Sequence, residues 1–247
     1  MGWLVLIGPS LFIAASLAVG LRCVRLGMRN RQIPEWAIGV TMLSAGVGGY
    51  GLIGGLPLLP GLPKGVLHAS SALGDIAVSV GAASLYLFTW RTYRLDSPWA
   101  QWVFLASATL MAGITLGMLW TWSYPLPYAD RPAWYPVTLA IQTASFGWSS
   151  FEDLRYWRLM RRRMRLGLAD PEIAQRMLNW GIAAASACIL TLIYSVAWME
   201  MGTLIPSLEV VALLSLPGLV AAVNVWLAFF PPASYLRHFA PTPERAE

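Results

Sequence analysis

The sequence predicts an all-α integral membrane protein, folded as a bundle of seven transmembrane helices with the N-terminus outside and the C-terminus cytoplasmic. The composition supports this class, because 57% of the residues are hydrophobic, 12% are charged and the mean hydropathy is +0.58. Several apolar segments also reach the roughly 20 residues that a helix needs to cross a hydrocarbon layer of ~30 Å. The cationic residues, finally, are confined almost entirely to alternate links between these segments.

Residues 1–235 form one predicted transmembrane domain, and residues 236–247 form a short cytoplasmic tail. The predicted spans cover about residues 3–21, 36–58, 69–90, 99–122, 134–154, 178–200 and 208–230. No cationic residue precedes the first apolar run. We therefore expect a retained first helix rather than a cleaved signal peptide.

The link from Phe151 to Trp180 fixes the orientation of the predicted bundle. It carries the densest group of cationic residues: Arg155, Arg158, Arg161, Arg162, Arg163, Arg165 and Arg176. Of the 17 Lys and Arg residues, all except Lys64 and Arg131 fall on the same side of the predicted membrane. Short Arg-rich links remain cytoplasmic, so we expect a multi-pass protein of the inner (plasma) membrane. The net charge of +5 lies in these links, which leaves no basic domain for nucleic acid.

Polar side chains inside the predicted spans give a candidate ligand site toward the outer side. Asp75 is the acidic residue placed deepest in a span, where an ionisable group is costly and is by default a functional hypothesis. The candidate ligand-binding residues are Asp75, Gln142, Tyr50, Tyr194, Thr115, His68 and Trp198. One alternative is structural: a protonated Asp75 would make an interhelical hydrogen bond with Tyr50, Gln142 or a Ser hydroxyl. The other is a wet cavity, in which a charged Asp75 attracts a cation or an amine.

A second candidate region lies at the cytoplasmic end of the fifth span. Glu152 and Asp153 precede Arg155 and Arg158 at a spacing that favours ion pairs along one helix. The alternative is that these charged residues act as a conformational latch. The candidate contacts for a cytoplasmic partner are Arg158, Arg161, Arg162, Arg163 and Arg165.

The link after this cluster carries signals for a helix end and a helix start. Gly167 suits the end of one helix, while Asp170 followed by Pro171 suits the start of the next.

Small residues recur four positions apart in three spans, as in the pairs Gly51 and Gly55, Ala77 and Gly81, and Gly113 and Gly117. Such faces let helix backbones approach closely. We expect them to pack inside the bundle rather than to form a dimer.

The sequence offers no set of groups for catalysis or for a bound metal. Two Cys and two His do not assemble a zinc site at standard spacing, and no nucleophile stands beside a base. A retinal Schiff base needs a lysine within the bundle, whereas the single lysine, Lys64, lies in an outer link. We expect a protein that is not an enzyme and has no cofactor. Non-covalent binding of a carotenoid or a lipid remains an open alternative.

Two stretches, RRRMRLGLADPEIAQRMLNWG and LAFFPPASYLRHF, resemble the corresponding loops of a group of bacterial seven-helix proteins. In that group the bundle stands alone or forms the N-terminal sensor region of histidine kinases and related signalling proteins. The resemblance implies a sensor-like bundle, although the chain shows no output domain before Glu247.

The leading hypothesis is a non-enzymatic sensor-like or accessory bundle. It would bind a small or lipidic ligand from the outer side and couple to a cytoplasmic signalling protein or to membrane subunits. A structural subunit of a larger membrane complex is the second hypothesis, and a small-solute transporter is the third.

Overall fold

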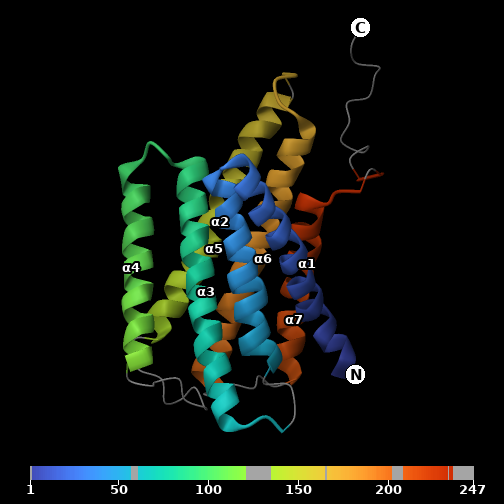
Figure 1. Ribbon diagram of the computed structural model, residues 1–247. Helices are drawn as coiled ribbons and strands as arrows, with labels where there is room; N and C mark the ends of the chain where they lie inside the picture. Colours follow the sequence, from blue (N-terminus) through green and yellow to red (C-terminus); the bar gives the residue numbers. More distant parts are fainter. Residues whose placement is uncertain are drawn as a thin grey trace.

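The computed structural model describes residues 2–56, 61–120, 135–164, 166–201, 208–232 and 234–235, and these residues contain helices and no strand. The helices are α1 (Gly2–Asn30), α2 (Ile33–Thr41), α3 (Lys64–Tyr93), α4 (Pro98–Trp120), α5 (Tyr135–Met164), α6 (Pro171–Met201) and α7 (Leu208–Phe229). Two π-helical stretches, Met42–Gly49 and Gly51–Gly55, continue α2 along the same path (Figure 1). The all-helical class predicted from the sequence is confirmed for the described part of the chain.

Six helical stretches in the described residues are long and apolar enough to cross a membrane. They cover Ser10–Asn30, Ile33–Ile53, Lys64–Tyr93, Pro98–Trp120, Pro171–Ala197 and Ala212–Phe229. These stretches indicate a multi-pass membrane protein. Helix α5, which contains most of the predicted span 134–154, is not among them because Ser, Thr and Gln lower its hydropathy. The predicted tail, residues 236–247, lies outside the described residues.

Several helices extend beyond the predicted spans. Helix α1 continues to Asn30 and α5 continues to Met164, while α6 begins at Pro171. In each case the additional turns are polar or cationic. Hydropathy therefore located the apolar middle of each helix and missed its polar ends.

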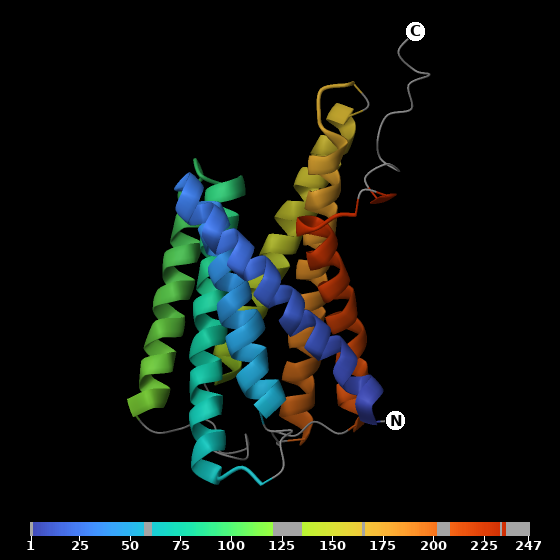
Figure 2. The same ribbon diagram turned by 45° about the vertical axis from the view of Figure 1, so that its right-hand side comes forward.

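The ends of the helices sort by charge. In Figures 1 and 2, α1, α3, α5 and α7 all finish at one end of the bundle, opposite to the end at which α1 begins. We call this end the arginine end, because it holds Arg29 of α1, Arg91 of α3 and Arg161 to Arg163 of α5. The predicted asymmetry of charge thus corresponds to one end of the bundle, and its cytoplasmic orientation remains a prediction.

Helix α3 lies inside the bundle, whereas α4 lies at its edge (Figure 1). In the most apolar stretch of α3, 61% of the residues are buried, whereas in that of α4 only 11% are buried. The largest apolar core cluster of the described residues draws on every α-helix except α4. Its members include Val19, Leu85, Phe146, Trp180 and Val225. Helix α4 packs mainly on α3, through Met111, Thr115 and Met118.

The small-residue pairs divide into packed and open positions. A Cβ atom added at Gly81 would lie 2.6 Å from the Cβ of Ala45, so this glycine lets α3 approach the π-helical stretch, as predicted. A Cβ added at Gly51, Gly55 or Gly113 would meet no described atom within 4 Å, so these glycines show no close packing against the described part of the bundle. Sequence spacing shows which residues share a face, but not whether that face meets another helix.

The link between α5 and α6 has the predicted caps. Gly167 adopts a positive φ of 69°, and its N–H donates to the carbonyl of Met164 at 3.0 Å. The Asp170 carboxylate accepts the backbone N–H of Glu172 at 2.8 Å, and α6 begins at Pro171 as expected. Arg165 lies outside the described residues.

Candidate functional site

One face of α5 carries a stripe of polar side chains that runs through the bundle. The polar stripe of α5 consists of Tyr135, Thr138, Gln142, Ser145, Ser149 and Asp153, each exposed by 3% or less. Successive members are three or four residues apart, which places them on the same side of a helix. Polar groups are seldom buried along a whole helix unless partners bind them, so the partners of this stripe define the site.

Most of the partners are on α3. Tyr135 donates to Asp75 at 3.2 Å, Gln142 donates to Ser79 at 3.2 Å, and the Tyr93 hydroxyl donates to Asp153. Beside the stripe, Arg94 donates to Glu152 at 2.7 Å and Tyr86 donates to the carbonyl of Ile141 at 2.9 Å. We call this set of contacts the α3–α5 polar interface. It joins two parallel helices from Asp75 to the arginine end (Figure 1).

Asp75 marks the end of the interface opposite the arginine end. It is 2% exposed, and the Tyr135 hydroxyl binds its Oδ1 atom. Tyr135 packs with Ala72, Met118 and Leu139, and Tyr194 of α6 packs against this group. Asp75 thus takes part in an interhelical hydrogen bond, as the structural alternative expected, but it accepts this bond and the donor is Tyr135, which was not among the expected partners. Whether Asp75 is protonated stays a prediction.

The other candidate residues are distributed over different contacts. Gln142 binds Ser79, one turn along α3 from Asp75. Thr115 is buried on the α4 face that carries Met111 and Met118, and its hydroxyl has no hydrogen-bond partner among the described residues. Gln142 and Thr115 therefore lie at different positions along the bundle and do not share a contact with Asp75 in the hydrogen bonds described here.

Tyr50 belongs to a separate cluster with Phe12 of α1 and with Ala221 and Ala222 of α7. Its ring meets that of Phe12 edge-on, with centroids 5.6 Å apart, and its buried hydroxyl bonds to no atom in the part of the chain that the structure describes. His68 is half-buried in the first turns of α3. The side chain of Trp198 lies outside the described residues, although its backbone is part of α6.

At the arginine end, two adjacent carboxylates of α5 are buried. Asp153 is 0% exposed and accepts hydrogen bonds from Tyr93 and, at 3.0 Å, from Ser149. Glu152 is 4% exposed and binds Arg94, the residue that follows α3. The predicted pairing with Arg155 is confirmed at 3.5 Å, but the shorter ion pair of Glu152 is the one with Arg94 from the neighbouring helix. This cluster joins α5 to the C-terminal end of α3.

The candidate partner contacts beyond this cluster are accessible. Arg158, Arg161, Arg162 and Arg163 are exposed, and the Arg161 guanidinium lies 5.6 Å from the centroid of the Trp157 ring. Their exposure is compatible with a partner surface at the arginine end.

The two stretches that carry the resemblance touch each other. Tyr235, which follows α7, accepts hydrogen bonds from Gln175 at 2.6 Å and from Asn179 at 3.1 Å, both on α6. The polypeptide that leaves α7 is thus held on the first turns of α6. The sequence did not indicate this contact, because the partners are 56 and 60 residues apart.

Within the described residues, no group of three or more His, Cys, Asp or Glu side chains is arranged to hold a metal ion. Comparisons of the chain with models of protein families, with curated proteins and with solved structures find no match. Fold and burial together define a helical, multi-pass membrane protein with a polar interface between two of its helices.

Proposed function

We propose that the protein is a non-enzymatic membrane bundle of the sensor or accessory type. It binds a small or lipidic ligand near Asp75 and couples to a cytoplasmic or membrane partner at the arginine end. The observation that carries this proposal is the α3–α5 polar interface, which extends from Asp75 to the pair Asp153 and Glu152.

The chemistry of this interface supports a role in coupling. Hydrogen bonds between helices depend on the distance and angle between donor and acceptor, so they fix which residues of α3 and α5 face one another. Each such bond contributes on average only about 0.6 kcal/mol in a membrane, so a ligand that competes for Asp75 can rearrange the interface without unfolding it. A change at Asp75 would reach Arg94 through α3, because Asp75 lies within this helix and Arg94 is the residue at its C-terminal cap.

The arginine end supplies two features that a partner could recognise. One is the exposed cationic surface of Arg158 and Arg161 to Arg163. The other is the contact of Tyr235 with α6, which connects the chain after α7 to the helix that follows the cationic link. Motion of α5 against α3 would move both features.

The proposal is tested by purifying the full chain in a mild detergent and identifying retained small molecules by mass spectrometry. Asp75→Asn keeps the shape of the side chain and removes its charge, so the variant should fold and retain less of the bound molecule than the wild type. It should also alter hydrogen–deuterium exchange over residues 155–176.

Asn224→Ala is the matched control, because Asn224 donates within its own helix, to the Val220 carbonyl at 2.9 Å. It should leave both measurements unchanged. Equal retention and equal exchange in Asp75→Asn and wild type would refute a ligand-coupled role for Asp75.

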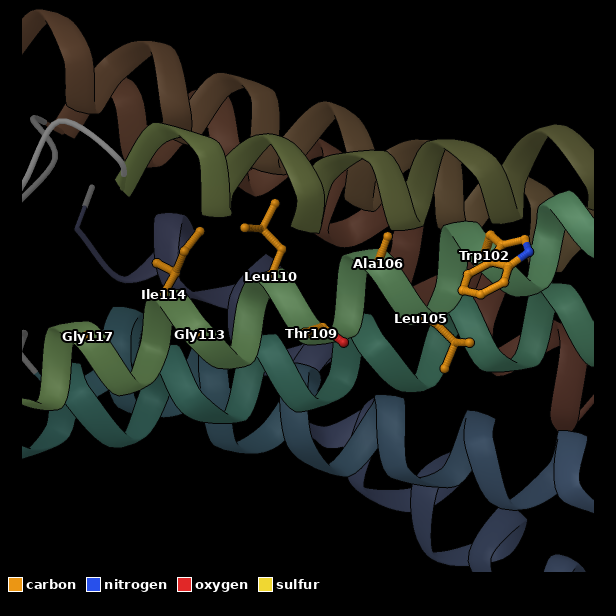
Figure 3. A pocket seen from close by; sticks show the side chains of 8 residues that line it. All are labelled: Trp102, Leu105, Ala106, Thr109, Leu110, Gly113, Ile114 and Gly117. Carbon is orange, nitrogen blue, oxygen red and sulfur yellow. The ribbon is translucent and has the colours of Figure 1, made fainter.

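A second candidate function, a structural subunit of a larger membrane complex, is favoured by α4. A groove of about 910 Å³ runs along this helix and is lined by Trp102, Leu105, Ala106, Thr109, Leu110, Gly113, Ile114 and Gly117. In Figure 3 the side chains of Ala106, Leu110 and Ile114 point away from α3, and Gly113 leaves space for another helix.

Gly113→Leu should then reduce the mass of the complex isolated in mild detergent. Gly51→Leu is the control, because a Cβ at this position also meets no described atom within 4 Å. An unchanged mass in Gly113→Leu would exclude α4 as the subunit contact.

A further inference from the structure

A groove at the arginine end combines an apolar floor with three cations. It has a volume of about 560 Å³ and lies along the exposed face of α1, beside the end of α7. Its lining consists of Ala18, Leu21, Arg22, Arg25, Leu26, Arg29 and Phe230, and none of these residues is acidic. Arg22, Arg25 and Arg29 are three and four residues apart, so the guanidinium groups project from one side of α1 over about two turns.

Arg22 is fixed by the end of α7. Its guanidinium donates to the Phe229 carbonyl at 2.6 Å and lies 4.7 Å from the centroid of the Phe230 ring. The Phe230 ring stacks on Trp226 with centroids 4.7 Å apart. Because Pro231 and Pro232 cannot continue the helix, the Phe229 carbonyl needs a donor from elsewhere, and Arg22 supplies it. The wall of the groove is therefore built by contacts between two helices.

Arg25 and Arg29 have a different role, because both are exposed and neither joins an ion pair with another described residue. Their charges remain available above an apolar surface that includes the half-exposed Leu21, at 42%. Arginine binds phosphate oxygens through two parallel N–H groups, and basic pockets between transmembrane helices bind anionic head groups. A molecule with a phosphate at one end and a hydrocarbon chain at the other matches both parts of the groove.

We propose that this groove binds one anionic phospholipid of the leaflet at the arginine end. The lipid phosphate lies between Arg25 and Arg29, and an acyl chain lies along Ala18 and Leu21. Arg22 holds the end of α7 against α1, so that Phe230 closes one side of the groove. The site is independent of the ligand proposed near Asp75, and the lipid would stabilise the contact between α1 and α7.

The test uses the full chain, purified and stripped of lipid in detergent. Binding of dioleoyl phosphatidylglycerol and of dioleoyl phosphatidylcholine is measured by native mass spectrometry and by the shift in thermal unfolding. The variant is Arg25→Gln with Arg29→Gln, which leaves the Arg22 contact intact. The matched control is Arg162→Gln with Arg163→Gln, which removes two exposed cations from the same end of the bundle.

Phosphatidylglycerol should bind the wild type and the control more tightly than phosphatidylcholine. In Arg25→Gln with Arg29→Gln the affinity for phosphatidylglycerol should fall roughly 10- to 30-fold, as expected for the loss of two cations near a head group. An unchanged affinity in this variant, or an equal loss in the control, would overturn the proposal.

A further arm separates a lipid from a free anion. Glycerol 3-phosphate carries the charge of the head group without the acyl chains, so it should not raise the unfolding temperature of the wild type. Stabilisation by glycerol 3-phosphate equal to that by the lipid would show a site for soluble phosphate and would also overturn the proposal.

Discussion

Replacing Arg94 by glutamine removes the cation that the buried Glu152 carboxylate binds across the α3–α5 polar interface. In the native protein the Arg94 Nε atom lies 2.7 Å from Glu152 Oε1, and the Glu152 side chain is 4% exposed. After the substitution, the ion pair left to Glu152 is the one with Arg155 at 3.5 Å, whose side chain is 50% exposed. A largely buried carboxylate would then lack its closest counter-charge.

The expected loss follows from the burial of the pair. Removing one partner of a fully buried ion pair costs about 3–5 kcal/mol, because the other charge remains buried. The Arg94 side chain is 23% exposed and Arg155 retains part of the attraction, so the cost should be lower, at about 2–3 kcal/mol. Arg94→Gln combined with Glu152→Gln should recover much of this loss, because no uncompensated charge is left buried.

The assay is reversible unfolding in detergent, carried out as a double-mutant cycle over Arg94 and Glu152. Arg176→Gln is the control, because its ion pair with Glu172 is exposed by 45% and 39% and should contribute at most about 0.5 kcal/mol. Two results would contradict the reasoning. One is a cost for Arg94→Gln no larger than that for Arg176→Gln, and the other is a double variant in which the two losses simply add.

Two further predictions concern topology and caps. A cysteine introduced at Lys64 should react with an impermeant reagent from outside the cell and one at Arg162 should not, because the arginine end is expected in the cytoplasm; reaction at Arg162 from outside would invert the assignment. Gly167→Val should lower stability by about 1–3 kcal/mol, because a β-branched residue is strained at a φ of 69°. Asp170→Ala should cost about 0.5–2 kcal/mol through loss of the N-cap of α6, and thermal unfolding unchanged in both variants would show that the caps contribute nothing.

The sequence was sufficient for the helical class and for the gathering of cationic residues at one end. Both properties depend on residues that are close together in the sequence. Hydropathy is a sum over consecutive residues, and a helix that crosses the bundle places the segments before and after it at opposite ends. The caps at Gly167 and Asp170 were also predictable, because they depend on residues adjacent in the chain.

The partners within the bundle were not predictable in this way. Tyr135 was not among the candidate residues, yet it is 1% exposed and binds Asp75, which lies 60 residues earlier in the chain. The dominant partner of Glu152 likewise comes from 58 residues away, although Arg155 on the same helix had suggested local pairing. The three- and four-residue spacing of the polar stripe was visible in the sequence, but the position of α3 beside it depends on the tertiary fold.

The α3–α5 polar interface also limits how the two helices can move. Its side-chain contacts join residues separated by nearly the same distance in sequence, 60 for Asp75, 63 for Ser79, 60 for Tyr93 and 58 for Arg94. A small slide of α5 along α3 would strain all four contacts together, and a new set of facing residues arises only after about one helical turn, or ~5.4 Å. The interface thus favours discrete registers over gradual displacement, so that any movement it transmits would be stepwise.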